Sequence, residues 1–301
     1  MTYMVTGAFS FTGRHVAKRL LEEGEEVRTM TRFPQSASPF AEAVPAVPFD
    51  YDDVGALTQA LRGCDRLINT YWRRQPEGNL GYDRVVQQSK NLFAAAKAVG
   101  IERIVHMSIN DPHGKKFPYF RAKCATERAV RECTVSSVVV RPQLVFGDGE
   151  LLINNLAWTL RQSRLAAVPG DGQYLMQPIH ASDYAELIVG LSRNRRDGVV
   201  NGVGPDVMTY DDMVSMVGNA IGRKPRILHV HPKFFDRVAR LINRFVEEPT
   251  VLDYEVYGCL VENGVVPREP QGTRRLVDWL RDHADSLGRR YADQDRRPFS
   301  G

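Results

Sequence analysis

The sequence predicts an α/β fold, a doubly wound parallel sheet with a smaller, mostly helical C-terminal lobe. Short apolar stretches alternate with helical patterns in the first half of the 301-residue chain. These apolar stretches are continuous, which is typical of parallel strands buried on both faces. After Phe146 the alternation gives way to helical patterns. We therefore expect a first domain of residues 1–145 plus about 176–200, and a second lobe of about 146–175 plus 201–301.

The elements follow from residue periodicity and from Gly and Pro punctuation. Strands are expected at 3–5, 26–31, 66–70, 103–108 and 137–140, with a short third strand ending at Asp50. Helices are expected at 15–23, 54–61, 82–99, 122–132, 151–160, 209–221, 234–245 and 273–287. Residues 179–191 are expected to add one more strand and helix to the sheet.

Composition limits the partners and the compartment. Hydrophobic residues make up 43% and charged residues 25% of the chain, and the net charge of +4 is spread over both signs. No basic footprint for nucleic acid and no apolar run of membrane-spanning length is visible. The four cysteines lack metal-ligand spacing and the histidines are scattered. We expect a reduced, cytoplasmic protein, a monomer or homodimer, with no metal site.

A glycine turn follows the first predicted strand and leads into the first helix. Gly7, Ser10 and Gly13 occupy the spacing of a dinucleotide-binding loop, whose backbone N–H groups face a pyrophosphate. Ser10 stands where the middle glycine usually lies, and its hydroxyl is expected to donate to a phosphate oxygen. The residues between, which complete the predicted cofactor loop, are Phe9, Phe11 and Thr12.

The end of the second strand indicates which dinucleotide is bound. Thr31-Arg32 stands where an acidic residue would bind the ribose of NAD, whereas an arginine accommodates the 2′-phosphate of NADP. We therefore expect NADP in preference to NAD. The alternative is that Arg32 is a solvated strand-end charge, and Arg14 is a second candidate for the phosphate.

Two further strand ends are expected to line the cofactor. Asp50-Tyr51 places a carboxylate and a ring near the adenine. The fourth strand closes with Asn69, Thr70 and Tyr71, where main chain passes beside the ribose. Trp72, which follows, is interpreted either as a flat wall of the substrate site or as a packed core residue.

Tyr119 and Lys123 carry the predicted chemistry. Their i, i+4 spacing places the phenol and the ammonium on one helix face, where the ammonium stabilises the phenolate. Such a phenol exchanges a proton with an alcohol or carbonyl while hydride moves to or from a nicotinamide. Ser108, at the end of the fifth strand, is a candidate to polarise the carbonyl, or else a strand-end serine that satisfies the backbone.

These motifs together resemble the atypical or extended short-chain dehydrogenases/reductases, close to the NmrA-like group and to the nucleotide-binding accessory subunit of respiratory complex I. The resemblance rests on the glycine turn, 31–32, 50–51, 90–92, 104–108, 119–123, Glu127, 141–142, 169–172, 178–183 and 204–210. It implies a Rossmann-type sheet, with Tyr119 as acid/base, Lys123 on the nicotinamide ribose, and the segment after Pro142 flanking the nicotinamide. Only ten residues separate Ser108 from Tyr119, fewer than in the sugar-nucleotide epimerases of this group.

Two functions remain open at this point. The first is an NADP(H)-dependent oxidoreductase acting on a small carbonyl, alcohol or activated alkene. The second is a redox sensor or structural subunit that binds the dinucleotide without turning it over. Tyr119 and Lys123 favour the enzyme, and the short loop before Tyr119 favours the binder.

Overall fold

The computed structural model describes residues 1–31, 40–72, 81–113, 117–231, 234 and 268–292. They form two compact units. The first comprises Met1–Pro142 with Ala181–Gly202, and the second comprises Gln143–His180 with the described residues from Val203 onward. Arg32 and the greater part of the predicted helix at 234–245 lie outside the described residues.

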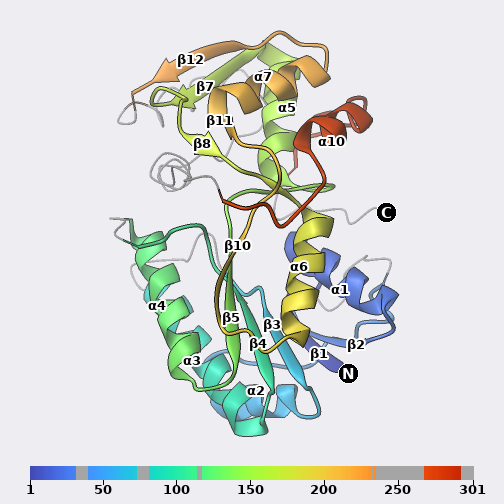
Figure 1. Cartoon of the computed structure of the whole chain (residues 1–301), viewed down its shortest axis with the longest axis vertical. Helices are drawn as coiled ribbons and strands as arrows, with labels where there is room; N and C mark the ends of the chain where they lie inside the picture. The colour runs from blue at the N-terminus through green and yellow to red at the C-terminus, as the bar shows by residue number, and fades with distance from the viewer. Residues whose placement is uncertain (32–39, 73–80, 114–116, 232–233, 235–267, 293–301) are drawn as a thin grey trace. The chain divides into compact units, whose positions relative to one another are not determined.

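The first unit is built on a parallel six-stranded sheet (Figure 1). Its strand order is β10-β5-β4-β3-β1-β2, so the chain reverses its direction of growth between β1 and β3. Every residue of β3 and β4 is buried, as continuous apolar runs predict. The strands are β1 (Thr2–Thr6), β2 (Glu26–Met30), β3 (Arg66–Asn69), β4 (Arg103–Met107), β5 (Ser137–Pro142) and β10 (Gly198–Gly202).

Helices cover both faces of this sheet, which makes the fold doubly wound (Figure 1). Helix α1 packs against α6 on one face, while α2, α3 and α4 pack side by side on the other. Their bounds are α1 (Phe11–Glu22), α2 (Val54–Leu61), α3 (Gly81–Val99), α4 (Pro118–Glu132) and α6 (Ala181–Arg193). The predicted fold class is confirmed.

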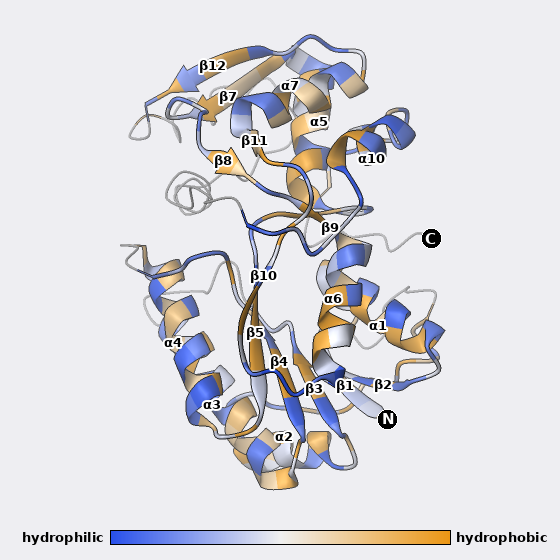
Figure 2. Ribbon diagram, viewed as in Figure 1, coloured by the Kyte–Doolittle hydropathy of each residue, from blue (hydrophilic) through white to orange (hydrophobic). Residues whose placement is uncertain are grey.

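Apolar side chains fill the space between the sheet and the second helix layer. Leu57, Leu92, Phe93 and Ile104 are among the buried residues of this core. Figure 2 shows the central strands as mainly hydrophobic, whereas the helices carry hydrophobic and hydrophilic residues on different sides. Burial of one helical stripe against an apolar sheet provides the main stabilising free energy.

A buried arginine fixes the edge strand to the sheet. Arg103, at the start of β4, has no exposed side-chain surface. Its guanidinium donates to the carbonyl oxygens of Leu191 (3.2 Å) and Arg196 (2.6 Å), and it also pairs with the Asp197 carboxylate. The segment between α6 and β10 is thereby held against β4.

Two strand predictions were wrong. Residues before Asp50 form no strand among the described residues, and a single bridge joins Ala46 to Thr29 on β2. Prolines at 45 and 48 remove the N–H groups that a longer ladder needs. The pair Ile179–His180 forms β9 in the second unit, and it is β10 that completes the sheet beside β5.

The second unit combines helices with short strand pairs. Its helices are α5 (Leu151–Ser163), α7 (Tyr210–Ala220) and α10 (Leu276–Asp282). Two parallel pairs join β6 (Val145–Phe146) to β9 (Ile179–His180) and β7 (Leu165–Pro169) to β12 (Arg226–Val230). An antiparallel pair joins β8 (Leu175–Met176) to β11 (Met208–Thr209). In the described part of the chain, no helix is long and apolar enough to cross a membrane.

Candidate functional site

The glycine turn brings the start of α1 onto the end of β1. Gly7 has φ +66°, a conformation that favours glycine, and its carbonyl accepts the N–H of Ser10 at 2.8 Å. A Cβ on Gly13 would lie 2.1 Å from the Gly7 carbonyl oxygen. Only glycine at residue 13 permits this approach, which places the N-terminus of α1, a site suited to an anion, directly beside the end of β1.

Ser10 is the N-cap of α1, which gives a local reason for serine in place of a glycine. Its φ of −75° and ψ of 167° are extended and place no demand for glycine. Its hydroxyl oxygen accepts the N–H of Gly13 at 3.3 Å. An N-cap serine satisfies one of the unpaired N–H groups of a helix. Accepting this bond does not use the hydroxyl hydrogen, whose expected donation to a phosphate oxygen stays a prediction.

The other residues of the turn have separate environments. Phe9 is 3% exposed and packs on Phe40, so it belongs to the core. Phe11 packs its ring edge-on to His15 with centroids 5.6 Å apart. Thr12 lies in the first turn of α1 and is partly exposed. Phe11 and Thr12 therefore lie at the helix end that would face a pyrophosphate.

The strand ends of β1 and β3 are joined by hydrogen bonds at the point where the sheet reverses. The Thr6 hydroxyl donates to Asn69 Oδ1 at 3.1 Å and accepts the N–H of Thr70 at 2.8 Å. The Thr70 hydroxyl donates to the Thr6 carbonyl, and Asn69 Oδ1 also accepts the N–H of Tyr71 at 3.0 Å. Ligands of open α/β sheets bind beside this reversal.

The predicted adenine residues meet the same segment. The Tyr51 and Tyr71 rings stack with centroids 4.1 Å apart. Asp50 is exposed and accepts the N–H of Asp52 at 2.9 Å, which fixes the turn that carries Tyr51. Thr31 is partly exposed just beyond the end of β2, before the undescribed residues that include Arg32.

Helix α4 presents Tyr119 and Lys123 together. Lys123 is 5% exposed, and its Nζ lies 3.7 Å from the centroid of the Trp72 ring and 5.9 Å from that of Tyr119. The Tyr119 ring packs edge-on to Trp72 (5.2 Å) and to Tyr82 (6.1 Å). Trp72 thus holds the Lys123 ammonium by a cation–π contact, a role that sequence reasoning missed.

Ser108 extends the β4 ladder beyond the assigned strand. Its N–H donates to Val140 O at 2.8 Å, and the N–H of Asn110 donates to the carbonyl of Pro142 at 2.8 Å. Residues two apart share a face of a strand, so Ser108 projects on the side of His106, which contacts Thr126 of α4. From His106 to Ser108 the strand advances by about 7 Å. Helix α4 runs in the opposite direction, so Lys123 and Tyr119 lie about 4.5 Å and about 10 Å beyond Thr126 along the same direction. Ser108 is therefore level with the stretch of α4 between Lys123 and Tyr119.

His106 is a buried neutral histidine that sequence reasoning also missed. Burial, with a smaller effect of the Lys123 charge, lowers the pKa of His106 to about 3. Its Nδ1 lies 3.1 Å from Asn69 Nδ2 and its Nε2 lies 3.3 Å from the Thr126 hydroxyl. The available signal was a polar residue in the middle of the apolar run 104–107.

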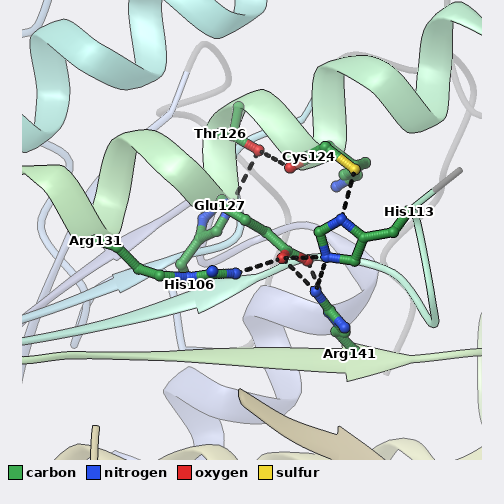
Figure 3. A network of polar contacts seen from close by, with 8 residues as sticks. His106, His113, Cys124, Thr126, Glu127, Arg131 and Arg141 are labelled. Atoms are coloured by element: carbon green, nitrogen blue, oxygen red, sulfur yellow. Dashed lines mark hydrogen bonds and ion pairs between the residues drawn. The ribbon is translucent and has the colours of Figure 1, made fainter. Parts of the chain in front are cut away.

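An ion-pair network joins α4 to β5 (Figure 3). The Glu127 carboxylate, 1% exposed, accepts two bonds from Arg141 (2.8 and 2.5 Å) and one from Arg131 (2.9 Å). Arg141 also lies 2.7 Å from His113 Nε2, and His113 Nδ1 lies 3.5 Å from Cys124 Sγ. Burial raises the pKa of the Cys124 thiol, so this network supports structure in preference to thiolate chemistry.

Several features fit a bound dinucleotide. Gly13 packs so closely on the Gly7 backbone that the turn has no room for a side chain at residue 13. The Ser108 Oγ and the Trp72 Nε1 are buried, and neither has a hydrogen-bond partner among the residues that the structure describes. Buried donors without a partner are costly in a folded protein and commonly bind a ligand or water. Among the described residues, no group of three or more His, Cys, Asp or Glu side chains could hold a metal ion.

Comparison with known proteins agrees with this geometry. Residues 7–151 match a family model described as NAD(P)H-binding. The chain is 23% identical over 269 residues to the mitochondrial NADH dehydrogenase [ubiquinone] 1 alpha subcomplex subunit 9 of Dictyostelium discoideum, covering 84% of this chain and 73% of the relative. It is 27% identical over 231 residues to the ceramide reductase of Caulobacter vibrioides, covering 75% and 72%.

Solved structures share the fold. The triphenylmethane reductase of Citrobacter sp., in complex with NADP(H), superposes with a TM-score of 0.75 at 17% identity, covering 94% of this chain and 100% of that one. At this identity the likeness concerns the fold. The two sequence relatives comprise a reductase and a respiratory-complex subunit, the two classes that the sequence left open.

Proposed function

We propose that this chain, whose residues 7–151 match a family model described as NAD(P)H-binding, is an NADP(H)-dependent oxidoreductase. Its substrate is a small carbonyl, alcohol or activated alkene. The proposal rests on two observations. Tyr119 and Lys123 lie close together on α4, and the Ser108 hydroxyl at the end of β4 is buried with no hydrogen-bond partner among the described residues. A protein that only binds dinucleotide requires neither the Tyr119 phenol nor the Ser108 hydroxyl.

The cofactor half of the proposal uses the N-terminal turn and the strand ends. The N–H groups at the start of α1 and the Ser10 hydroxyl bind the pyrophosphate. Tyr51 and Tyr71 provide an aromatic surface for the adenine, with Asp50 beside it. Thr31 and Arg32 receive the 2′-phosphate, for which Arg14 is the second candidate.

The chemical half uses α4 and β4. When bound, the nicotinamide accepts or supplies the hydride. Tyr119 donates the proton to the developing alkoxide in the reducing direction, and Lys123 anchors the nicotinamide ribose and stabilises the phenolate. The Ser108 hydroxyl donates to the carbonyl oxygen, and the segment after Pro142 borders the nicotinamide.

A second candidate is a dinucleotide-binding subunit without turnover. The observation that favours it is the similarity to the complex I subunit of Dictyostelium discoideum. The two candidates differ in what the Tyr119 hydroxyl does, because an assembly or sensor role does not use its proton.

Tyr119→Phe separates the two candidates. Purified protein is tested with NADPH against small aldehydes, ketones and enones, and the loss of NADPH absorbance is followed. We expect the variant to lose at least 100-fold in kcat/KM, within the range for a general acid, while NADPH affinity stays within about twofold. Tyr82→Phe removes a neighbouring phenol of the same aromatic cluster and is expected to keep turnover. Full activity in Tyr119→Phe removes this phenol from the mechanism.

Cofactor preference tests the role of Arg32. We expect NADPH to bind at least tenfold more tightly than NADH, because a guanidinium–phosphate pair is a strong charge-assisted contact. Arg32→Asp abolishes or reverses the preference in a fluorescence titration. Equal affinities in the wild type contradict the assignment, and a preference lost only in Arg14→Ala transfers it to Arg14.

A further inference from the structure

We propose that His106 is a positioning residue, which fixes the helix that carries Tyr119 and Lys123 to the strand ends beside the glycine turn. Its role for the cofactor rests on the proposed function, whereas the hydrogen-bond chain that defines it rests on the geometry alone. Part of this chain, His106 with Thr126, is visible in Figure 3.

The α4 end of the hydrogen-bond chain fixes the protonation of one nitrogen of the His106 ring. The Thr126 hydroxyl has one hydrogen, which it donates to the Lys123 carbonyl at 2.9 Å. Toward His106 this hydroxyl can therefore only accept, and the ring nitrogen 3.3 Å away must carry a hydrogen. His106 is thereby assigned as an Nε2–H donor.

The strand end of the hydrogen-bond chain fixes the protonation of the other ring nitrogen. Asn69 Oδ1 accepts both the Thr6 hydroxyl and the N–H of Tyr71, which orients the amide. The Asn69 NH2 group then faces His106 Nδ1 at 3.1 Å, and this nitrogen accepts. Both ring nitrogens are satisfied in a single neutral tautomer.

The bonds all run in one direction, from Thr6 through Asn69, His106 and Thr126 to the Lys123 carbonyl. Asn69, His106 and Thr126 are 5% exposed or less. A buried network with every member satisfied holds its elements in one arrangement, because any slip leaves a polar group unpaired in low dielectric. The chain links β1, β3 and β4 to α4.

Helix α4 begins without a side-chain cap, so contacts further along it, such as that of Thr126 with His106, contribute to its position. Its N-cap residue, Phe117, has no side-chain hydrogen bond to the first turn, although Pro118 at N1 favours a helix start. Lys123 lies one turn before Thr126, and their contact is direct. A displacement of Thr126 from His106 would therefore shift the ammonium that anchors the ribose in the proposed function.

Thr126→Val tests the link with little change of volume, and Thr126→Ser restores the hydroxyl. We expect NADPH to bind about tenfold more weakly to Thr126→Val, the effect of one lost hydrogen bond that leaves a buried N–H unpaired, and near normally to Thr126→Ser. Ser192→Ala is the matched control. Ser192 is fully buried and donates to the Val189 carbonyl at 2.6 Å, also three residues back.

A double-mutant cycle separates positioning from general loss of structure. In a Lys123→Met background, Thr126→Val is expected to change NADPH affinity by less than about twofold, because the group that it positions is absent. An equal loss in both backgrounds overturns the proposal, and so does unchanged affinity of Thr126→Val in the wild-type background.

Nitrogen NMR of the His106 ring tests the chain without cofactor. The wild type is expected to show one neutral tautomer with hydrogen on Nε2. Thr126→Val is expected to keep this tautomer, because Asn69 still donates to Nδ1, and to shift the Nε2 resonance, because the Nε2–H has lost its acceptor. A hydrogen on Nδ1 in the wild type overturns the proposal. If the wild type binds no dinucleotide, the proposed function fails, while the NMR result still decides whether His106 holds Thr126.

Discussion

At residue 13, the absence of a Cβ decides whether α1 can begin against the end of β1. The Gly7 carbonyl oxygen would lie 2.1 Å from that Cβ, a distance at which the backbone must move. Gly7 itself meets only ordinary contacts and is constrained by its φ of +66°. The two glycines are therefore required for different reasons, one by contact and one by conformation.

We expect Gly13→Ala to lower the free energy of unfolding by about 2 kcal/mol and to abolish dinucleotide binding, because overpacking against backbone displaces the turn. Urea unfolding and NADPH titration measure the two effects. Gly190→Ala is the control, since Gly190 lies in α6 with nothing within 4 Å of the added Cβ. That change is expected to stabilise the protein by about 0.5–1 kcal/mol through helix propensity. A stable Gly13→Ala protein with normal affinity contradicts the contact argument.

Single residues also show the limit of sequence reasoning. The Gly7–Ser10–Gly13 spacing is local, so the turn was predictable from the chain. The function of His106 was not, because its partners Asn69 and Thr126 lie 37 and 20 residues away and meet it only in the folded sheet. Trp72 was recognised as a candidate wall, but its contact with Lys123 depends equally on tertiary structure.

At the scale of elements, α4 and β5 are joined by one buried carboxylate. Glu127 is 1% exposed and Arg141 is 12% exposed, whereas Arg131 is half exposed. The two arginine pairs of Glu127 therefore differ in how much solvent screens them.

Glu127→Gln is expected to lower the free energy of unfolding by about 2 kcal/mol, because it leaves the largely buried Arg141 charge without its carboxylate partner. Arg131→Ala removes the exposed partner of the same carboxylate and is expected to cost less than about 1 kcal/mol. Urea midpoints at constant slope measure both. Similar losses in the two variants would mean that burial does not distinguish these pairs.

Elements with a long periodic or apolar pattern were predicted correctly. Short strands, whose place depends on the partner strand they pair with, were not. The helix 54–61 was predicted with the bounds of α2, and the strands of the sheet interior were recognised by their apolar runs. The short pair at 179–180 was assigned to the wrong sheet, since two residues do not encode a partner. The strand β10 has exposed and partly exposed residues through most of its length, so it lacks the apolar signal of the interior strands.

At the scale of the whole molecule, His106 couples stability to pH. Its folded-state pKa of about 3 lies below the ordinary value of 6.5, so its contribution is complete above pH 6.5 and is lost as the pH falls. Burial is the main cause, and the nearby Lys123 charge adds to it.

We expect the wild type to lose about 2 kcal/mol of unfolding free energy between pH 6 and pH 4 through this group, beyond the loss from carboxylates. Urea unfolding of His106→Gln over the same pH range is expected to show a shallower dependence, from a lower starting stability. Parallel curves for the two proteins would show that His106 titrates in the folded state as it does in the unfolded chain.

The edge strand β10 has a consequence for how the protein is made. It pairs with β5, and the segment before it supplies the carbonyl acceptors of the buried Arg103 guanidinium. A nascent chain emerging from the ribosome has all the other sheet strands by residue 142, yet one side of β5 stays unpaired until residue 202 is free. An unpaired strand edge is a template for association with other chains. A gene product truncated after residue 151, the end of the NAD(P)H-binding match, would therefore carry the glycine turn but remain prone to aggregate.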